Sequence, residues 1–176
     1  MSTVAPLGAE QQTLASLFQR INEHEQRGEL DAAEKLLDET FGAEPKHPYA
    51  IHLSGILAWR RGRAEDALRL MERSIELDPK HGLYPRNLCE IYRVLGRYDE
   101  AVAHGQRATA LAPKDAQAHV NLSMVHYDRR DIDQALACAD AALGLDAAFA
   151  SAHFARARFC RKARLAAECN NQDART

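Results

Sequence analysis

The chain has 176 residues, of which 46% are hydrophobic and 27% charged, and it carries 23 Lys+Arg against 25 Asp+Glu. This is the composition of an ordinary folded protein, and a formal net charge of −2 lacks the basic excess that a nucleic-acid binder needs to neutralise phosphates. Aromatic residues make up only 6% while alanine is abundant, which favours closely packed helices over strands.

Neither a membrane helix nor a secretory signal is predicted. No stretch approaches the roughly 18 apolar residues that a membrane span requires, and residues 1–8 hold neither a basic residue nor an apolar run. The four cysteines form no CxxC pair, which disfavours a zinc site. Small buried thiols in a reducing, cytoplasmic compartment are the better interpretation of Cys89, Cys138, Cys160 and Cys169.

In chain order, residues 1–13 are predicted to be a short disordered leader, after which the sequence repeats every 34 residues. Three independent sets of residues keep this spacing without an insertion, which chance composition would not supply. They are Ala33, Ala67, Ala101 and Ala135; Gly28, Gly62 and Gly96, with Arg130 in the fourth place; and Pro45, Pro79 and Pro113, with Ala147 in the fourth place.

Each repeat reads as helix, turn, helix, turn. In the second repeat, Pro48 suits a first helical position, Gly62 ends that helix in a left-handed conformation, and Pro79 stops the next one. One hairpin leaves its apolar faces bare, so neighbouring hairpins must stack on each other. We therefore expect eight helices in four antiparallel hairpins between about residues 10 and 147, a ninth helix from about residue 150, and no strand.

The pattern resembles the tetratricopeptide repeat (TPR) family, whose 34-residue motif is W-x2-L-G-x2-Y…A-x3-F…P. Its second half is held by Ala33, Leu37 and Pro45; Ala67, Met71 and Pro79; Ala101, Gly105 and Pro113; and Ala135, Ala139 and Ala147. The resemblance covers four repeats, residues 14–47, 48–81, 82–115 and 116–149. It implies an all-α fold, a right-handed superhelical array of antiparallel helix hairpins.

Residues 150–176 form the end of the array, as a partial fifth repeat or capping helix followed by a polar tail. Residues 150–163 continue the pattern as a first helix, and residues 165–169 begin a second helix that is too short to complete the hairpin. We expect Phe154 and Phe159 to cover part of the fourth repeat and to leave apolar surface that drives weak self-association. A frayed, monomeric end is the competing expectation.

The eight histidines raise the question of chemistry. His24 and His126 share one repeat position and His119 and His153 share another, so packing explains their spacing better than a site does. His119 and His126 lie seven residues apart, too far for the i, i+4 pair that grips zinc. No phosphate loop, nucleophile elbow or acidic metal cluster is present. We expect no enzymatic activity, no metal and no cofactor.

In the TPR family, the first helix of each repeat lines a concave surface, so the resemblance implies a protein or peptide partner. The predicted binding residues on these helices are Tyr49, His52, Trp59, Arg86, Asn87, Arg93, Asn121, Met124 and Tyr127. Tyr, Trp and Arg dominate the energetics of interfaces. Arg86 and Arg93 predict a preference for acidic or carboxylate-bearing ligands. Asn87 and Asn121, one repeat apart, resemble the Asn ladder by which some superhelical members hold an extended peptide.

Two functional classes stay open. The first is a stand-alone adaptor or scaffold that binds a partner peptide or helix in the groove. The second is a substrate-recruiting arm detached from a larger enzyme, since similar Ala-rich arrays precede catalytic domains in bacterial glycosyltransferases that resemble the O-linked GlcNAc transferase. A glycosyltransferase-like continuation in the neighbouring reading frame would favour the second.

Overall fold

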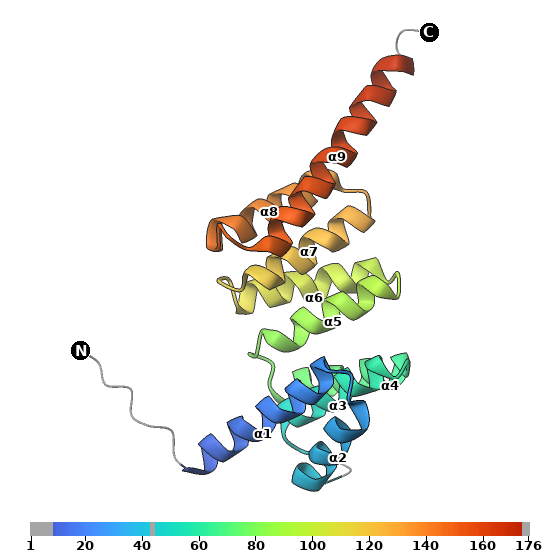
Figure 1. The fold of residues 1–176 in the computed structure, drawn as a ribbon. Helices are drawn as coiled ribbons and strands as arrows, with labels where there is room; N and C mark the ends of the chain where they lie inside the picture. The colour runs from blue at the N-terminus through green and yellow to red at the C-terminus, as the bar shows by residue number, and fades with distance from the viewer. Residues whose placement is uncertain (1–8, 43–44, 174–176) are drawn as a thin grey trace, which may run out of the picture. The chain divides into compact units, whose positions relative to one another are not determined.

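The computed structural model describes the backbone of residues 9–42 and 45–173, and the side chains of residues 15–42 and 45–163. In these residues the chain forms nine α-helices and no strand, as the repeat predicts (Figure 1). They are α1 (Ala9–Gln26), α2 (Leu30–Phe41), α3 (Pro48–Arg60), α4 (Ala64–Leu77), α5 (Leu83–Val94), α6 (Tyr98–Leu111), α7 (Ala116–Asp128), α8 (Ile132–Leu145) and α9 (Ala150–Asp173).

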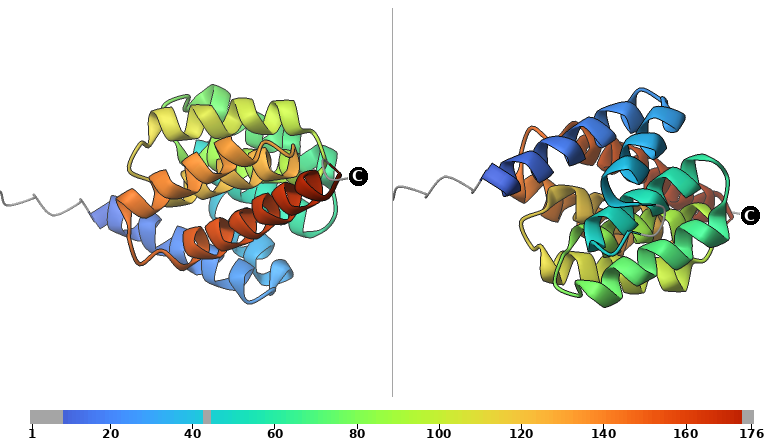
Figure 2. Two further views of the ribbon diagram at one scale, coloured as in Figure 1. Left: turned by 90° about the horizontal axis from the view of Figure 1, so that it is seen from above. Right: turned by 90° about the horizontal axis from the view of Figure 1, so that it is seen from below.

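The helices belong to two compact units, Met1–Asp78 with α1 to α4 and Pro79–Thr176 with α5 to α9. Consecutive helices pair as hairpins: α1 with α2 and α3 with α4 in the first unit, α5 with α6 and α7 with α8 in the second. In the second unit α7 also packs on α5 and α6, and α9 packs on α7 and α8, as the views along the array show (Figure 2). Each first helix of that unit after α5 therefore lies against the preceding hairpin.

The starts of α3 and α7 follow from local capping. Pro48 occupies the first turn of α3, and His47 Nδ1 accepts a hydrogen bond from the Tyr49 backbone N–H at 3.2 Å. Asp115 caps α7 in the same way, accepting from the Gln117 N–H at 3.0 Å. These caps satisfy backbone donors that a helix leaves unpaired at its first turn.

The turn between the two helices of each hairpin has the same backbone in all four repeats. Gly28, Gly62 and Gly96 have φ between +74° and +76°, and Arg130 takes their place with φ +67°. The residue after each of them donates its N–H to the carbonyl five residues earlier, at 2.9 Å in every case. Arg130 thus adopts a left-handed conformation that costs a side chain with a Cβ about 1–2 kcal/mol.

Replacing Arg130 with glycine is expected to raise the free energy of unfolding by about 0.5–1 kcal/mol, because relief of the left-handed strain outweighs the extra entropy of an unfolded glycine. Urea unfolding followed by circular dichroism measures the change. Gly96→Ala is the matched control. It should lower the free energy of unfolding by about 1 kcal/mol, because alanine is strained in the left-handed conformation. Equal or lower stability of Arg130→Gly would contradict the expectation.

The small residues of the repeat lie where the paired helices cross. Ala33, Ala67, Ala101 and Ala135 have no solvent-exposed surface. Their methyl groups let the helices approach closely, and larger side chains such as Leu37, Met71 and Leu88 fill the space around them. The 34-residue spacing of alanine therefore records a packing requirement.

The end of the array differs from the sequence prediction. We expected a first helix to about residue 163 and the start of a second one at residue 165, but α9 is one helix of 24 residues, Ala150–Asp173. Residue 164, at the repeat position of the left-handed turn, is an arginine, and the flanking alanines favour continued helix. Residues 170–173, expected in the polar tail, are helical too, and residues 9–13 of the expected leader form the start of α1. The rest of the leader, residues 1–8, lies outside the described residues.

Candidate functional site

One repeat position near the end of each first helix carries a large side chain. It holds Glu25 in α1 and Trp59 in α3 of the first unit, and Arg93 in α5 and Tyr127 in α7 of the second. All four side chains are half-buried. Trp, Arg and Tyr are the residue types most often found at binding hot spots, so the surroundings of this position decide what each can do.

In the first unit, polar bonds join α1 to α3. Arg60 Nε donates to Glu25 Oε1 at 2.6 Å, and Asn22 Nδ2 donates to the Tyr49 hydroxyl at 3.1 Å. The Tyr49 ring meets Phe18 edge-on, with centroids 4.6 Å apart. Tyr49 is therefore held by its neighbours on both its polar and its apolar side.

In the second unit, Arg93 joins α5 to α7. Its Nη1 donates to Asp128 Oδ2 at 2.6 Å, and its Nε and Nη2 donate to the Glu90 carboxylate at 2.9 and 2.7 Å. The hydrogen bonds to Glu90 and then to Asp128 raise the pKa of Arg93, against the opposing effect of burial. The guanidinium is fixed by two carboxylates from two helices.

Asn121 forms part of a second bridge between the same two helices. Its Nδ2 donates to the Arg86 carbonyl at 3.2 Å, and its Oδ1 accepts from Gln117 Nε2 at 2.6 Å. Arg86 Nη1 in turn donates to Asp115 Oδ2 at 2.8 Å. Asn121 is only 9% exposed, and its Nδ2 group serves the contact between repeats while its Oδ1 is engaged within α7.

Tyr127 is held by α9. Its ring stacks on Phe159 with centroids 4.8 Å apart and an interplanar angle of 23°, and the Arg158 guanidinium lies 4.5 Å above the ring. Met124 packs against the same cluster. Tyr127 and Met124 thus form the support on which α9 rests.

The predicted binding residues divide by exposure. Two offer little surface to a ligand: His52 is fully buried, and Asn121 is nearly so. The half-buried members are Tyr49, Trp59, Arg86, Asn87, Arg93, Met124 and Tyr127. At the end of the array, Phe159 is fully buried whereas Phe154 is 71% exposed, so the two phenylalanines do not share the covering role we expected.

The carboxylates that form ion pairs with Arg86 and Arg93 were not identified from the sequence. Asp115 and Asp128 each follow their arginine by about one repeat, and Glu90 stands one turn before Arg93. The pair Arg93–Asp128 spans 35 residues, as does Glu25–Arg60 with the charges reversed. A search for opposite charges at that spacing would have found both.

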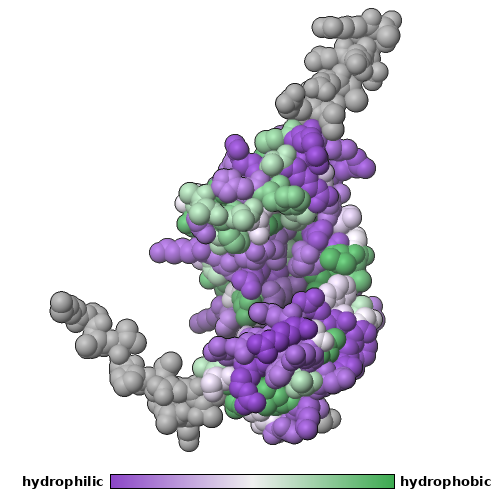
Figure 3. All heavy atoms as spheres, in the orientation of Figure 1, coloured by the Kyte–Doolittle hydropathy of each residue, from purple (hydrophilic) through white to green (hydrophobic). Residues whose placement is uncertain are grey.

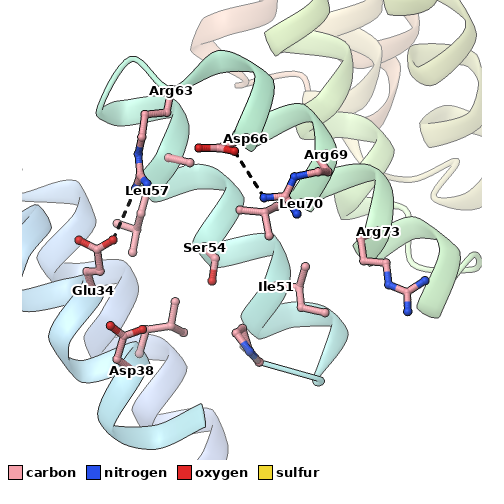
Figure 4. A pocket seen from close by; sticks show the side chains of 13 residues that line it. Glu34, Asp38, Ile51, Ser54, Leu57, Arg63, Asp66, Arg69, Leu70 and Arg73 are labelled. Carbon is pink, nitrogen blue, oxygen red and sulfur yellow. Dashed lines mark hydrogen bonds and ion pairs between the residues drawn. The ribbon is translucent and has the colours of Figure 1, made fainter. Parts of the chain in front are cut away.

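The first unit also contains a cleft of about 510 Å³ above α3, between α2 and α4 (Figure 4). Glu34 and Asp38 stand on the α2 side and Arg69 on the α4 side, and Arg63 closes one end by an ion pair to Glu34 at 3.5 Å. Ser54 lies on its floor, at the position where the third and fourth repeats bury Leu88 and Leu122. A leucine at this position would fill part of the cleft, a difference visible in the sequence that we did not interpret.

The histidines have packing and capping contacts. His24 Nδ1 lies 2.6 Å from Glu29 Oε2, and His126 Nδ1 lies 3.7 Å from Asp131 Oδ2. Burial lowers the pKa of His126, against the opposing effect of Asp131. Among the residues with described side chains, no three His, Cys, Asp or Glu residues are placed to hold a metal ion. Nor is any described helix long and apolar enough to cross a bilayer.

A sequence profile described as tetratricopeptide repeat matches residues 18–81, 52–116 and 120–168. The chain belongs to the tetratricopeptide repeat family. The TPR profile spans most of the array, including the part of α9 that packs on the fourth repeat. A search of curated proteins gave no match.

Solved structures with the same fold are TPR proteins. The Pseudomonas aeruginosa pilF structure has a TM-score of 0.76 and 19% identity over 85% of this chain and 68% of its own. The anaphase-promoting-complex hetero-tetramer Cut9-Hcn1 has a TM-score of 0.73 and 19% identity, over 81% of this chain but only 29% of that one. The first TPR domain of Spaghetti (RPAP3), bound to the HSP90 peptide SRMEEVD, has a TM-score of 0.64 and 15% identity over 69% of this chain and 96% of its own. These likenesses show the TPR solenoid fold.

Proposed function

We propose that the protein is a non-catalytic interaction module, an adaptor that binds a peptide or helix of a partner protein on its first helices. Membership of the TPR family supports the general role, and the Spaghetti domain with its HSP90 peptide is a case of a similar fold that binds a short peptide. We place the protein in the cytoplasm, on the ground that the cysteines with described side chains, Cys89, Cys138 and Cys160, are free thiols.

Trp59 is the observation that carries the proposal. At its repeat position, Glu25, Arg93 and Tyr127 are each engaged by a neighbouring helix through an ion pair or a stacked ring. Within the described residues of the first unit, Trp59 is half-buried without a ring stack or cation contact of this kind. A half-buried indole ring can bury a large apolar area against a ligand, and it loses little conformational entropy when it does so.

The ligand that fits this surface differs from the one we expected from the sequence. The positive charges of Arg86 and Arg93 are balanced by Asp115, Glu90 and Asp128, so they give little reason for an acidic ligand. We propose that a large apolar side chain of the partner packs against Trp59 and provides most of the affinity.

A random-peptide phage library selected on the whole protein tests the proposal. Trp59 is the single tryptophan, so its fluorescence should change when a selected peptide binds. Trp59→Ala should weaken binding about 30-fold, the equivalent of about 2 kcal/mol at a hot spot. Truncating Arg93 or Tyr127 is less informative, because each also holds two helices together.

Leu77→Ala is the matched control, since Leu77 is an exposed apolar residue on the second helix α4 of the same unit. It should leave the affinity within about 0.5 kcal/mol. Peptides that bind Trp59→Ala, with its circular dichroism unchanged, as tightly as the original protein would rule out the proposed anchor.

A further inference from the structure

Helix α9 occupies the place of a first helix in a fifth repeat. Its buried face packs on α7 and α8 through Ala152, Ala155 and Phe159, which have at most 1% of their surface exposed. Arg156 Nε also donates to Asp140 Oδ1 of α8 at 2.6 Å. α9 is thus anchored to the fourth repeat by this face, and its opposite face takes no part in the contact.

The inner repeats show what covers that opposite face elsewhere. Gly55 and Cys89, at equivalent positions of α3 and α5, are fully buried under the second helix of their own hairpin. A Cβ on Gly55 would lie 2.8 Å from Met71 Cγ of α4, and Cys89 Sγ lies 3.0 Å from the Cβ position of Gly105 in α6. The equivalent residue of α9 is Ala157, which is exposed.

The position three residues further along each first helix shows the same difference in burial. Ala58 of α3 and Tyr92 of α5 are buried beneath their second helices, whereas Cys160 of α9 is exposed. The chain does not return to cover it within the described residues, because α9 continues past residue 164, where the earlier first helices give way to a turn. A surface that is covered by a helix in the other repeats is therefore open on α9.

The open face combines apolar and basic groups. A cavity of about 440 Å³ is lined by Phe154, Ala157, Arg158 and Arg161. Residues 150–163 hold four basic side chains and no acidic one, and Arg161 in this cavity is exposed. In Figure 3, apolar and hydrophilic surfaces lie side by side over α8 and α9, next to the grey end of the chain.

We propose that this face of α9 binds an acidic amphipathic helix of a partner protein, which takes the place of the missing second helix of the fifth hairpin. The small Ala157 permits the close approach seen at Gly55, and Phe154 supplies exposed apolar area. Acidic side chains at the rim of the partner helix meet Arg158 and Arg161, which line the same cavity. A second copy fits less well, because a two-fold dimer would place the same basic face against itself.

Two designed 18-residue peptides test the proposal on the whole protein. Both have the same Leu/Ala apolar face at helical spacing, and their other positions hold Glu in one and Lys in the other. The Glu helix should bind at least 10-fold more tightly than the Lys helix, as measured by fluorescence anisotropy. Ala157→Gln should weaken the Glu helix at least 10-fold by blocking close approach, whereas Ala110→Gln, on an exposed alanine of α6, should not.

Cys160 reports where the helix binds. The Glu helix should slow its alkylation by iodoacetamide, mapped by mass spectrometry, while Cys89 stays unlabelled because burial raises the pKa of its thiol to about 12. Trp59→Ala should leave this binding unchanged, so the result is independent of the groove proposed above.

Equal affinity for the two helices, a Glu-helix Kd weaker than about 1 mM, or an unprotected Cys160 would overturn the proposal. So would a concentration-dependent dimer in sedimentation that Phe154→Ser abolishes, because that result would assign the face to a second copy.

Discussion

Replacing Phe159 with alanine is expected to lower the free energy of unfolding of the second unit by about 3–5 kcal/mol. The ring is fully buried among Tyr127, Ala135, Ala139 and Ala155, and it stacks on Tyr127. Truncation removes its apolar burial and leaves a cavity between α9 and the fourth repeat. Because α9 is anchored chiefly by this ring, its docking should be lost first.

Urea unfolding followed by circular dichroism measures this loss. Phe154→Ala is the matched control, since Phe154 lies on the same helix but is 71% exposed, and its effect should stay within about 0.5 kcal/mol. Similar losses in the two variants would contradict the assignment of Phe159 to the core. Phe159 is also unsuitable for probing the expected self-association, because a charge at this buried position would detach α9 from the fourth repeat.

Replacing Gly105 with leucine is expected to destabilise the second unit by about 3 kcal/mol. A Cβ at this position would lie 2.9 Å from Leu122 Cδ1 of α7 and 3.0 Å from Cys89 Sγ of α5. The remaining three carbons of a leucine have no space in a contact of three helices. The TPR motif has a large apolar residue at this position, and here the side chains of the neighbouring helices fill the space instead.

Gly144→Ala is the control for glycine in a helix of the same unit. Nothing lies within 4 Å of a Cβ there, so the substitution should stabilise α8 by about 0.5–1 kcal/mol through helix propensity alone. Thermal unfolding of both variants gives the comparison. If Gly105→Leu were as stable as the original protein, the packing of α6 against α5 and α7 would have to be looser than described.

The sequence by itself determined the helices and the turns. Their signals are local: Pro48 at a helix start, glycine at a left-handed turn, and buried alanine every 34 residues. Repetition made the glycine and alanine signals reliable, because each was seen three or four times. Even the substitution of Arg130 for glycine did not change the backbone, since the surrounding hairpin fixes it.

Only the tertiary structure decided which of the predicted binding residues are engaged within the protein. Arg93 is paired with Asp128, 35 residues along the chain, and Arg86 with Asp115, the residue that caps α7, 29 residues along. Side chains so far apart in sequence meet only when the hairpins stack, and the TPR motif specifies the stacking residues without specifying these partners. The two arginines that predicted an acidic ligand are therefore paired with carboxylates of the protein itself.

The end of the array was decided by tertiary structure for a related reason. Phe154 and Phe159 are five residues apart, which places them on different sides of a helix, but which side is buried depends on how α9 docks. Whether α9 breaks near residue 164 or continues depends on a balance between helix propensity and packing that a repeat pattern cannot measure. Arginine at this position does not by itself extend the helix, since Arg130 makes the turn and Asp131 after it caps α8; the alanine-rich segment after residue 164 favours the single long helix.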